Sequence, residues 1–267
     1  MKVFIILIIL FLVYILLNKS IKKKYDYKCF LLTLKTETAR QNNFFKNYNG
    51  NIPIEKIYGP DTRNIKTARK FEEYIDPEYF EKAVEMHYNL EIKRPDVTYF
   101  NIGAIGCFMG HMDFYKRCFD QGLKYAVIFE DNVTINSPEL YNQIQSVIDE
   151  KGNDFEMCFF HCLSRFCDSQ DGSLEKVKWI SSTKCYLINV DNMRKYQKYF
   201  LPMDNHIDMK HEDIISKGAR VYYKDLRKYM SIDRSHKSII GHSDHGRPLF
   251  VSRINPEITP SDLKWGY

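Results

Sequence analysis

Three polar residues, Glu130-Asp131-Asn132, directly follow the apolar run 125–129. A short apolar run that stops on acidic residues is typical of a buried strand, and open α/β sheets bind ligands at the carboxyl ends of their strands. Carboxylates at such an edge can hold a divalent metal, and the metal can hold a diphosphate. An acidic turn after a strand is the plainer alternative, so the segments around the triplet must decide between the two.

A second acidic segment lies later in the chain. The stretch Pro202–Met209 carries two carboxylates, Asp204 and Asp208, four residues apart. Glu212 and Asp213 follow closely and are rivals for any acid–base role. Three histidines of the C-terminal tail could complete a metal shell, although each by itself is better explained as a solvated loop residue: His236, His242 and His245.

The cysteines do not indicate a secreted disulfide framework. There are seven, an odd number, and they are scattered along the chain. Cys158, His161, Cys162 and Cys167 are close in sequence and suggest zinc, but the paired C-x-x-C spacing is missing. Because Cys158 and Cys162 fall in an apolar, strand-like run, core thiols are the favoured interpretation.

The composition is that of a folded domain, and the net charge weakly favours anionic partners. Of 267 residues, 44% are hydrophobic and 27% charged, which suits one large α/β domain or two small ones. The net charge of +5 weakly favours phosphates or a membrane surface. No basic run with interleaved aromatics is dense enough to indicate nucleic acid.

The N-terminal segment predicts a membrane anchor. Val3–Leu17 is apolar and uncharged, slightly short of the about 17–25 residues of a typical span. A cleaved signal peptide is the alternative, but no small-residue cleavage site follows. Lys19, Lys22, Lys23 and Lys24 outnumber Lys2, so the positive-inside rule places the remaining chain on the cytoplasmic face. The unpaired thiols agree, as does Asn132-Val133-Thr134, which would be glycosylated in a secretory lumen.

The elements that must position the acidic triplet follow from periodicity and turn residues. Strand, helix and strand over 29–58 form a βαβ unit and imply a parallel sheet. Residues 62–100 predict an excursion with an amphipathic helix near 78–90, and the tail from Arg234 predicts loop. Further elements are expected as a helix to about 121, strands at 124–129, 155–163, 179–183, 185–190 and 220–223, and helices at 138–151 and 191–201.

The stretch Gly103–His111 has glycines spaced so that backbone can approach a ligand or a neighbouring element closely. A glycine-rich helix start can bind phosphate. Packing of the helix against the sheet explains the same spacing equally well, and the sequence leaves both interpretations open.

In this order the segments resemble glycosyltransferase family 25, which includes lipopolysaccharide-type galactosyltransferases and collagen β-galactosyltransferase domains. The Gly103–His111 stretch is similar to the family's Gly-Glu-Ile-Gly-Cys-x-x-Ser-His signature, and Tyr125–Val133 to its strand ending in Glu-Asp-Asp-Val. Phe30–Arg40 resembles the opening strand with its following Arg, and Pro202–Met209 the Pro-Ile-Asp-x-x-x-Asp segment. The resemblance spans about Phe30 to Tyr229.

The resemblance implies a GT-A fold, which is a Rossmann-like mixed sheet flanked by helices. It also implies an enzyme that transfers a hexose from a UDP-linked nucleotide-sugar to a hydroxyl of a glycan, lipid-linked or protein acceptor. With the apolar N-terminal run and the composition of the tail, the chain is expected to divide into an anchor with basic flank (1–24), a transferase domain (25–235) and a loop-rich tail (236–267). By the resemblance, Thr33 and Arg40 lie near the nucleotide, and the donor pocket is shaped by Gly103, Gly106 and His111. The Asp-x-Asp-type position, which holds Mn²⁺ (or Mg²⁺), corresponds to Glu130, Asp131 and Asn132. Asp208 is implied in acceptor activation or metal support.

Three positions depart from the family pattern. Ala104 replaces the signature Glu, Gly110 the Ser, and Asn132 the last Asp of the triplet. An amide oxygen can ligate a hard cation but brings no charge, so metal affinity should fall. Asp131 then takes the metal, or metal dependence is weak, or catalysis has been lost.

Competing functions follow from these departures. A departing diphosphate must be neutralised, by a metal or by Arg and Lys, and an inverting transfer needs a carboxylate to accept the acceptor's proton. A binding module of the same fold without catalysis is the runner-up. A membrane-tethered metal-dependent phosphohydrolase would need a denser His/Asp constellation than this chain offers.

Overall fold

The computed structural model describes residues 25–46, 48, 52–89, 91, 100–235 and 264–265. The predicted anchor lies outside these residues, as do the three tail histidines. Among the helices that the structure does describe, none combines the length and the apolar character that crossing a bilayer requires.

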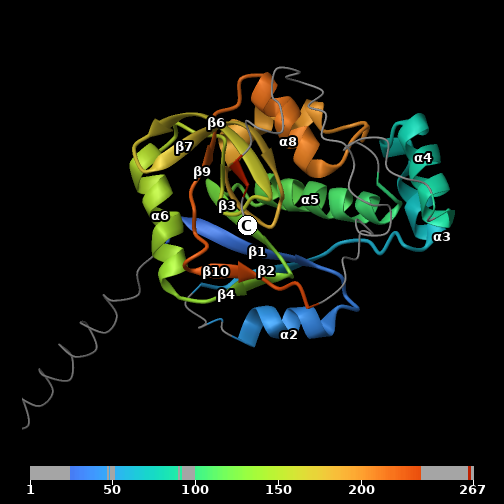
Figure 1. The fold of residues 1–267 in the computed structure, drawn as a ribbon, viewed down its shortest axis with the longest axis horizontal. Helices are drawn as coiled ribbons and strands as arrows, with labels where there is room; N and C mark the ends of the chain where they lie inside the picture. The colour runs from blue at the N-terminus through green and yellow to red at the C-terminus, as the bar shows by residue number, and fades with distance from the viewer. Residues whose placement is uncertain are drawn as a thin grey trace, which may run out of the picture.

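A mixed nine-stranded sheet crosses the centre of the described structure, in the order β11-β6-β7-β9-β5-β8-β3-β1-β2 (Figure 1). A separate two-stranded antiparallel sheet pairs β10 with β4. The strands, in chain order, are β1 Tyr27–Thr33, β2 Ile54–Tyr58, β3 Tyr125–Glu130, β4 Val133–Ile135, β5 Met157–Phe159, β6 Ser164–Asp171, β7 Leu174–Ser181, β8 Cys185–Asn189, β9 Val221–Tyr223, β10 Met230–Ile232 and β11 Lys264–Trp265.

Strand direction changes in the middle of the sheet. β1 pairs in parallel with β2 on one side and with β3 on the other, which confirms the parallel sheet expected from the βαβ unit. β8 then runs antiparallel to both β3 and β5. The carboxyl ends of β1, β2 and β3 therefore meet at one edge, and the residue before β8 arrives at that same edge from the opposite direction.

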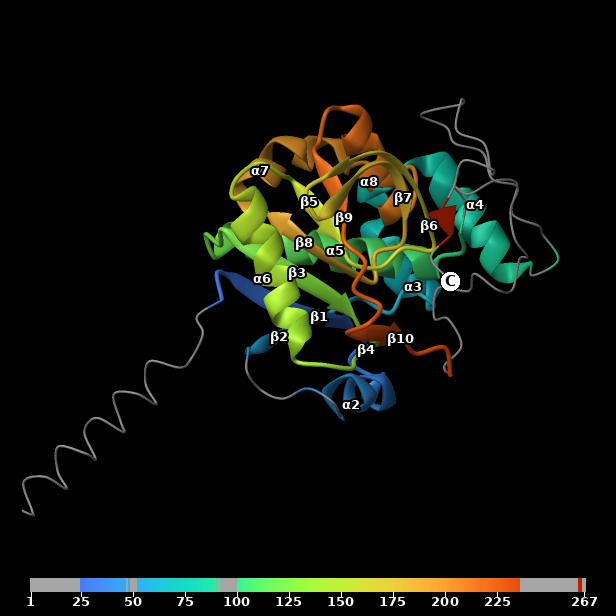
Figure 2. The same cartoon turned by 60° about the vertical axis from the view of Figure 1, so that its left-hand side comes forward.

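Helices cover both faces of the sheet (Figures 1 and 2). α5, α7 and α8 contribute to the core on one face, and α2 and α6 to the core on the other. The helical elements are α2 Thr38–Lys46, α3 Ile65–Ala68, α4 Pro77–Tyr88, α5 Gly103–Asp120, α6 Glu139–Lys151, α7 Val190–Met193 and α8 Ile207–Ser216, with 3₁₀ segments at Arg69–Tyr74 and Arg194–Tyr199.

The pleat of β3 decides where the acidic residues point. Successive strand side chains alternate between faces. Ala126 and Ile128 pack into the α5 core, whereas Val127 and Phe129 pack into the α2 and α6 core. Glu130 continues the first series and faces α5. Asp131 follows in the turn after the strand and lies on the α2 side, where it contacts Arg40.

Several expected elements differ in the structure. β6, Ser164–Asp171, was not predicted, because its sequence is polar and its later residues are half-buried or exposed beside β7. α8 was not predicted as a helix, and β4 and β10 were missed as strands. Part of the tail expected as loop, Lys264–Trp265, pairs antiparallel with β6 at the sheet edge.

Gly106 lets α5 approach the loop after β2 closely. A Cβ added there would lie 2.4 Å from the carbonyl oxygen of Pro60 and 2.7 Å from Thr62 Oγ1, which accepts the Gly106 N–H at 2.8 Å. We expect Gly106→Ala to lower the free energy of unfolding by about 1–3 kcal/mol, because backbone must move. Gly59→Ala is the matched control, since its Cβ meets atoms only from 3.5 Å outward. Urea unfolding of the two variants measures the difference, and equal losses would contradict the steric argument.

Candidate functional site

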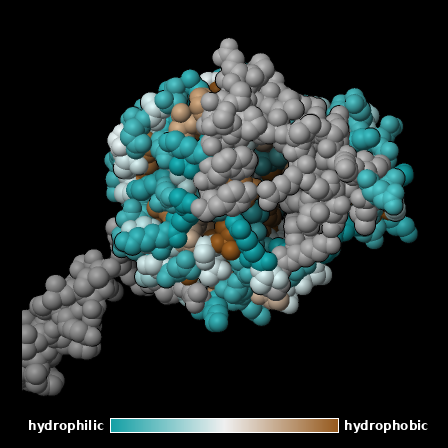
Figure 3. Space-filling model, in the orientation of Figure 1, coloured by the Kyte–Doolittle hydropathy of each residue, from teal (hydrophilic) through white to brown (hydrophobic). Residues whose placement is uncertain are grey.

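A pocket of about 350 Å³ opens at the edge where β1, β2 and β3 end. Its apolar wall includes Leu32, Phe100 and Ile207. Figure 3 shows hydrophobic surface in a hollow near the middle of this face, and most of the other coloured residues around it are hydrophilic. A wall of this kind can receive a flat or ring-shaped group while polar residues at the strand ends fix its orientation.

Asp131 is held in the wall by two residues from the start of the domain. Thr33 Oγ1 donates to its Oδ2 at 2.7 Å, and Arg40 Nη1 lies 3.3 Å from Oδ1. All three side chains are buried. Burial raises the pKa of the Asp131 carboxyl, while the Thr33 hydrogen bond and the Arg40 charge oppose that rise.

Glu130 makes a cross-strand ion pair with Lys184. Lys184 Nζ lies 2.5 Å from Glu130 Oε2, and Thr183 Oγ1 donates to Oε1 at 2.5 Å. Burial disfavours the charged form of both side chains, but the attraction between the two charges offsets this cost. The charge of Lys184, with His111 beside it, holds the pKa of Glu130 well below its usual range, and Glu130 raises that of Lys184. Both groups are therefore charged at neutral pH.

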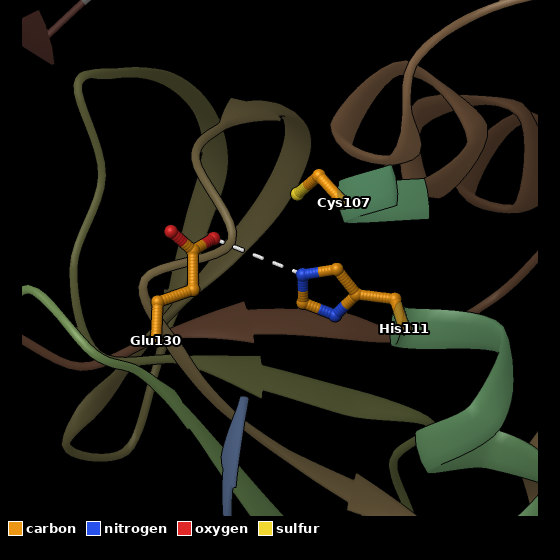
Figure 4. Close-up of side chains that lie close together, drawn as sticks. All are labelled: Cys107, His111 and Glu130. Atoms are coloured by element: carbon orange, nitrogen blue, oxygen red, sulfur yellow. Dashed lines mark ion pairs between the residues drawn. The ribbon is translucent and has the colours of Figure 1, made fainter. Parts of the chain in front are cut away.

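Cys107, His111 and Glu130 form a cluster with metal-ligating atoms (Figure 4). One such atom from each lies within 4.8 Å of the others, and His111 Nε2 is 3.7 Å from Glu130 Oε1. His111 Nε2 is buried without a hydrogen-bond partner. A thiolate, an imidazole and a carboxylate would suit a transition metal. Lys184 already neutralises the carboxylate that such a site requires.

A chain of buried hydrogen bonds leads from His111 into the core. His111 Nδ1 lies 2.8 Å from the Tyr186 hydroxyl, which donates to the Tyr115 hydroxyl at 3.2 Å. Tyr115 Oη lies 2.7 Å from Nε2 of His211 on α8. With His111 donating through Nδ1 and Tyr115 donating to His211, every hydroxyl in the chain gives one hydrogen and takes one.

Asp208 reaches the pocket from the first turn of α8. Its carboxylate pairs with Nδ1 of His206 and accepts the Ser182 N–H at 3.3 Å. Ser182 has a φ of 113°, which L side chains rarely adopt. Such backbone strain is concentrated at functional sites. Here the strained residue is the one whose amide is directed at Asp208.

Asp208 is separated from its rivals by position. Asp204 pairs with Lys210 at 2.6 Å, and Asp213 lies 3.7 Å from the same ammonium group. Glu212 is buried. Of these four carboxylates, only Asp208 belongs to the pocket wall.

A hard divalent cation fits the acidic triplet poorly. Mn²⁺ and Mg²⁺ take about six oxygen ligands, with carboxylates supplying the charge. Glu130 and Asp131 are already neutralised by Lys184 and Arg40. Asn132 offers a neutral oxygen, Oδ1, which is buried and has no hydrogen-bond partner. A dication at this point would be repelled by both cationic side chains.

The structure brings most of the residues expected from sequence to one pocket: Thr33, Arg40, Gly103, Gly106, Glu130, Asp131, Asn132 and Asp208. His111 lies outside that wall and contacts the site from behind Glu130. Gly103 and Gly106 both belong to α5 and line the pocket, and Gly106 also allows close packing against the loop after β2. The seven cysteines are free thiols. Cys158, His161, Cys162 and Cys167 do not form a metal-ligating group in the described structure.

Sequence reasoning missed several residues of the pocket wall: Asp61, Arg63, Ser182, Thr183, Lys184, His206 and Arg234. Lys184 is the most consequential, because its backbone carbonyl accepts the Glu130 N–H at 2.8 Å and so places the two residues opposite each other. A polar Thr-Lys pair before an apolar strand was the available signal. It gained meaning only once β8 was known to pair with β3.

His161 provides a pH-dependent probe of this wall. It is 6% exposed, its Nδ1 lies 3.3 Å from Ser182 Oγ, and burial lowers its pKa to about 4. Below pH 6.5 the unfolded chain binds a proton that the folded state does not, so stability falls between pH 6.5 and 4. We expect His161→Asn to remove about 2–3 kcal/mol of this loss at pH 4.5, as measured by urea unfolding at pH 7.5 and 4.5. Parallel pH dependences in the two proteins would contradict this assignment.

The sheet and its pocket define a class: an α/β protein with a Rossmann-like sheet and a pocket at the carboxyl ends of parallel strands, the edge at which open α/β sheets bind ligands. Within that class the chain belongs to glycosyltransferase family 25. The family model described as "Glycosyltransferase family 25 (LPS biosynthesis protein)" matches residues 26–215, and the chain is accordingly a glycosyltransferase. The family resemblance inferred from the sequence is confirmed.

Solved structures include distant likenesses. A UTP-bound UGPase from Acinetobacter baumannii has 7% identity and a TM-score of 0.42, covering 75% of this chain and 86% of that one. A197 from STIV has 8% identity and a TM-score of 0.38, covering 81% and 98%. A UDP-glucose pyrophosphorylase complexed with UDP-glucose has 9% identity and a TM-score of 0.37, covering 74% and 90%. These likenesses are too distant to bear on mechanism. Comparison with curated proteins found no match.

Proposed function

We propose that the protein transfers a hexose from a nucleotide-sugar, UDP-linked, to a hydroxyl of a glycan, lipid-linked or protein acceptor, and that its sheet is of the GT-A type. One observation carries the proposal. Asp208 on α8 and the charged strand ends around Glu130 and Asp131 border the same pocket. A carboxylate for the acceptor and cations for a diphosphate are the two requirements of this reaction.

The reaction assigns a role to each wall. The acceptor oxygen attacks the anomeric carbon and forms the new C–O bond, while the bond from that carbon to the diphosphate oxygen breaks. The electron pair leaves with the nucleoside diphosphate. Asp208 takes the proton of the acceptor hydroxyl, and the Ser182 amide holds the carboxylate in place. Thr33 and Arg40 fix Asp131, which orients the donor.

Release of free nucleotide from a panel of UDP- and GDP-hexoses, with and without simple sugar acceptors, tests the proposal. We expect the full-length protein to release UDP from a UDP-hexose and to do so faster with an acceptor. Asp131→Ala should slow the release, and unchanged activity in that variant would argue against the role of Asp131. Saturable binding without turnover would favour the non-catalytic alternative, which is motivated by Asn132. Absence of any nucleotide binding would refute both.

We also propose that Val3–Leu17 anchors the enzyme to a membrane with the pocket on the cytoplasmic face. The lysines at 19 and 22–24 and the free thiols support this arrangement. Tyr88 is 67% exposed, so Tyr88→Cys offers an accessible thiol. An impermeant maleimide should label that cysteine only after the membrane is opened, in excess of the wild-type background. Labelling in sealed cells would place the domain on the other side.

A further inference from the structure

The carboxylates of the pocket are already matched with partners in the protein. Glu130 pairs with Lys184, Asp131 with Arg40, and Asp61 with Arg63. Asp208 pairs with His206. Asp233, the remaining carboxylate of the wall, accepts a hydrogen bond from Asn43 at 2.8 Å. A divalent metal would have to displace one of these partners, whereas an anionic ligand would meet cations that are already in place.

Lys184 is the cation best placed to meet such a ligand at the β3 edge. It directly precedes β8 and lies opposite Glu130, so the backbone of two core strands fixes its position. Its side chain is 22% exposed and belongs to the pocket wall. An ammonium group has three donors. Glu130 Oε2 takes one of them, and the others can serve a ligand in the pocket.

Asn132 completes the pattern. The residue that would add a third negative charge to the triplet is an amide, and a lysine stands across the strand pair instead. Compared with a triplet of three carboxylates and no lysine, this wall has one anion fewer and one cation more. That change disfavours a bound dication and favours direct contact with phosphate.

We propose that Lys184 contacts the diphosphate of the donor and that this glycosyltransferase works without a divalent metal. The inference deepens the proposed function and rests on it. As the bond from the anomeric carbon to the diphosphate oxygen breaks, that oxygen keeps the electron pair, and the Lys184 ammonium stabilises the charge that develops. The guanidinium groups of Arg63 and Arg234 line the same pocket and can donate charge-assisted hydrogen bonds to phosphate oxygens.

The Cys107–His111–Glu130 cluster is the competing metal site. If it holds a metal in the working enzyme, UDP binding should depend on that metal. A transition metal there would bind Glu130 Oε1, the oxygen that faces His111, and would compete for it with the Thr183 hydroxyl and for the negative charge with Lys184 on Oε2. Metal binding would then be visible as a Co²⁺–thiolate absorption band that is lost in Cys107→Ser. Cys118→Ser serves as its matched control, since Cys118 is buried on the same helix and lies outside the cluster.

The test is the affinity of the full-length protein for UDP, measured by calorimetry in a chelator, in Mn²⁺ and in Zn²⁺. We expect the same dissociation constant in all three conditions. Affinity that appears only with a metal, or a Co²⁺–thiolate band that depends on Cys107, would overturn the proposal while leaving the proposed function intact. Failure of UDP and GDP to bind under every condition would instead refute the proposed function itself.

Variants assign the effect to Lys184. Lys184→Met should weaken UDP binding about 10- to 100-fold, the effect of one hydrogen bond to a charged group, and Lys184→Arg should restore most of it. Lys178→Met is the matched control, because Lys178 pairs with Asp168 on β6 and does not line the pocket. If Lys184→Met alone is unstable, the double variant Glu130→Gln/Lys184→Met replaces it, because that variant removes both charges of the buried pair. UDP affinity unchanged in a folded Lys184 variant would contradict the assignment.

A final variant converts the site. Asn132→Asp together with Lys184→Met restores a third carboxylate and removes the competing cation. We expect this double variant to bind UDP only when Mn²⁺ is present, whereas Asn132→Asp alone should remain insensitive to chelator. Insensitivity of the double variant to Mn²⁺ would argue that the cation at position 184 does not stand in for a metal.

Discussion

Asp208→Asn should lower kcat by about 10²- to 10⁴-fold, the contribution of general-base catalysis, while leaving the affinity for the nucleotide-sugar unchanged. The amide keeps the shape of the side chain and can still accept the Ser182 N–H, but it cannot take a proton. Initial rates of UDP release with saturating acceptor measure the effect.

Asp213→Asn is the control for this prediction. Asp213 lies on the same helix as Asp208, pairs with Lys210 and does not belong to the pocket wall. Its replacement should leave kcat unchanged. Similar losses in the two variants would indicate that both act through the stability of α8, and the proposed role of Asp208 would then be wrong.

Arg40→Met should lower the free energy of unfolding by about 3–5 kcal/mol, because it leaves the buried carboxylate of Asp131 without its cation. The side chains of this pair are only 7% and 6% exposed. Arg63→Met is the matched control at the rim of the same pocket. The Arg63 and Asp61 side chains are 44% and 41% exposed, so the loss there should stay within about 1 kcal/mol.

A second change separates charge from packing at Arg40. Adding Asp131→Asn to Arg40→Met removes the unpaired anion, and we expect it to recover much of the lost stability. Urea unfolding of the single and double variants at neutral pH provides the comparison. If the double variant is less stable than Arg40→Met, packing of the guanidinium and not its charge dominates at this position.

The first half of the domain could be predicted from local pattern. β1 and β3 each bury an apolar run, while α2 buries Phe44 and β2 buries Ile57, and each of the four ends at polar or turn residues. Such elements are recognisable from a single sequence because their burial imposes a period. The position of the acidic triplet followed directly, since it sits where an apolar strand stops.

The remaining features depend on contacts that are distant in sequence. β6 is a polar strand next to the sheet edge, paired with β7 on one side and with the short β11 on the other, and its later residues are half-buried or exposed, so little burial constrains its sequence. Lys184 is opposite Glu130 only because β8 reverses direction beside β3. His111 was expected to shape the pocket and instead lies behind it, because the α5 turn that carries it faces the sheet interior. No local period encodes any of these three outcomes.

The buried hydrogen-bonded chain from His111 through Tyr186 and Tyr115 to His211 limits where substitutions can alter the specificity of this enzyme. It joins α5 and the strand β8 to α8, the helix that carries Asp208, through groups that each need their neighbour. Helix and strand should therefore exchange their amide hydrogens with solvent as one cooperative unit. Altered preference for donor or acceptor should accordingly arise at rim residues such as Arg63 and Arg234, since a shift of α8 would break several buried hydrogen bonds at once.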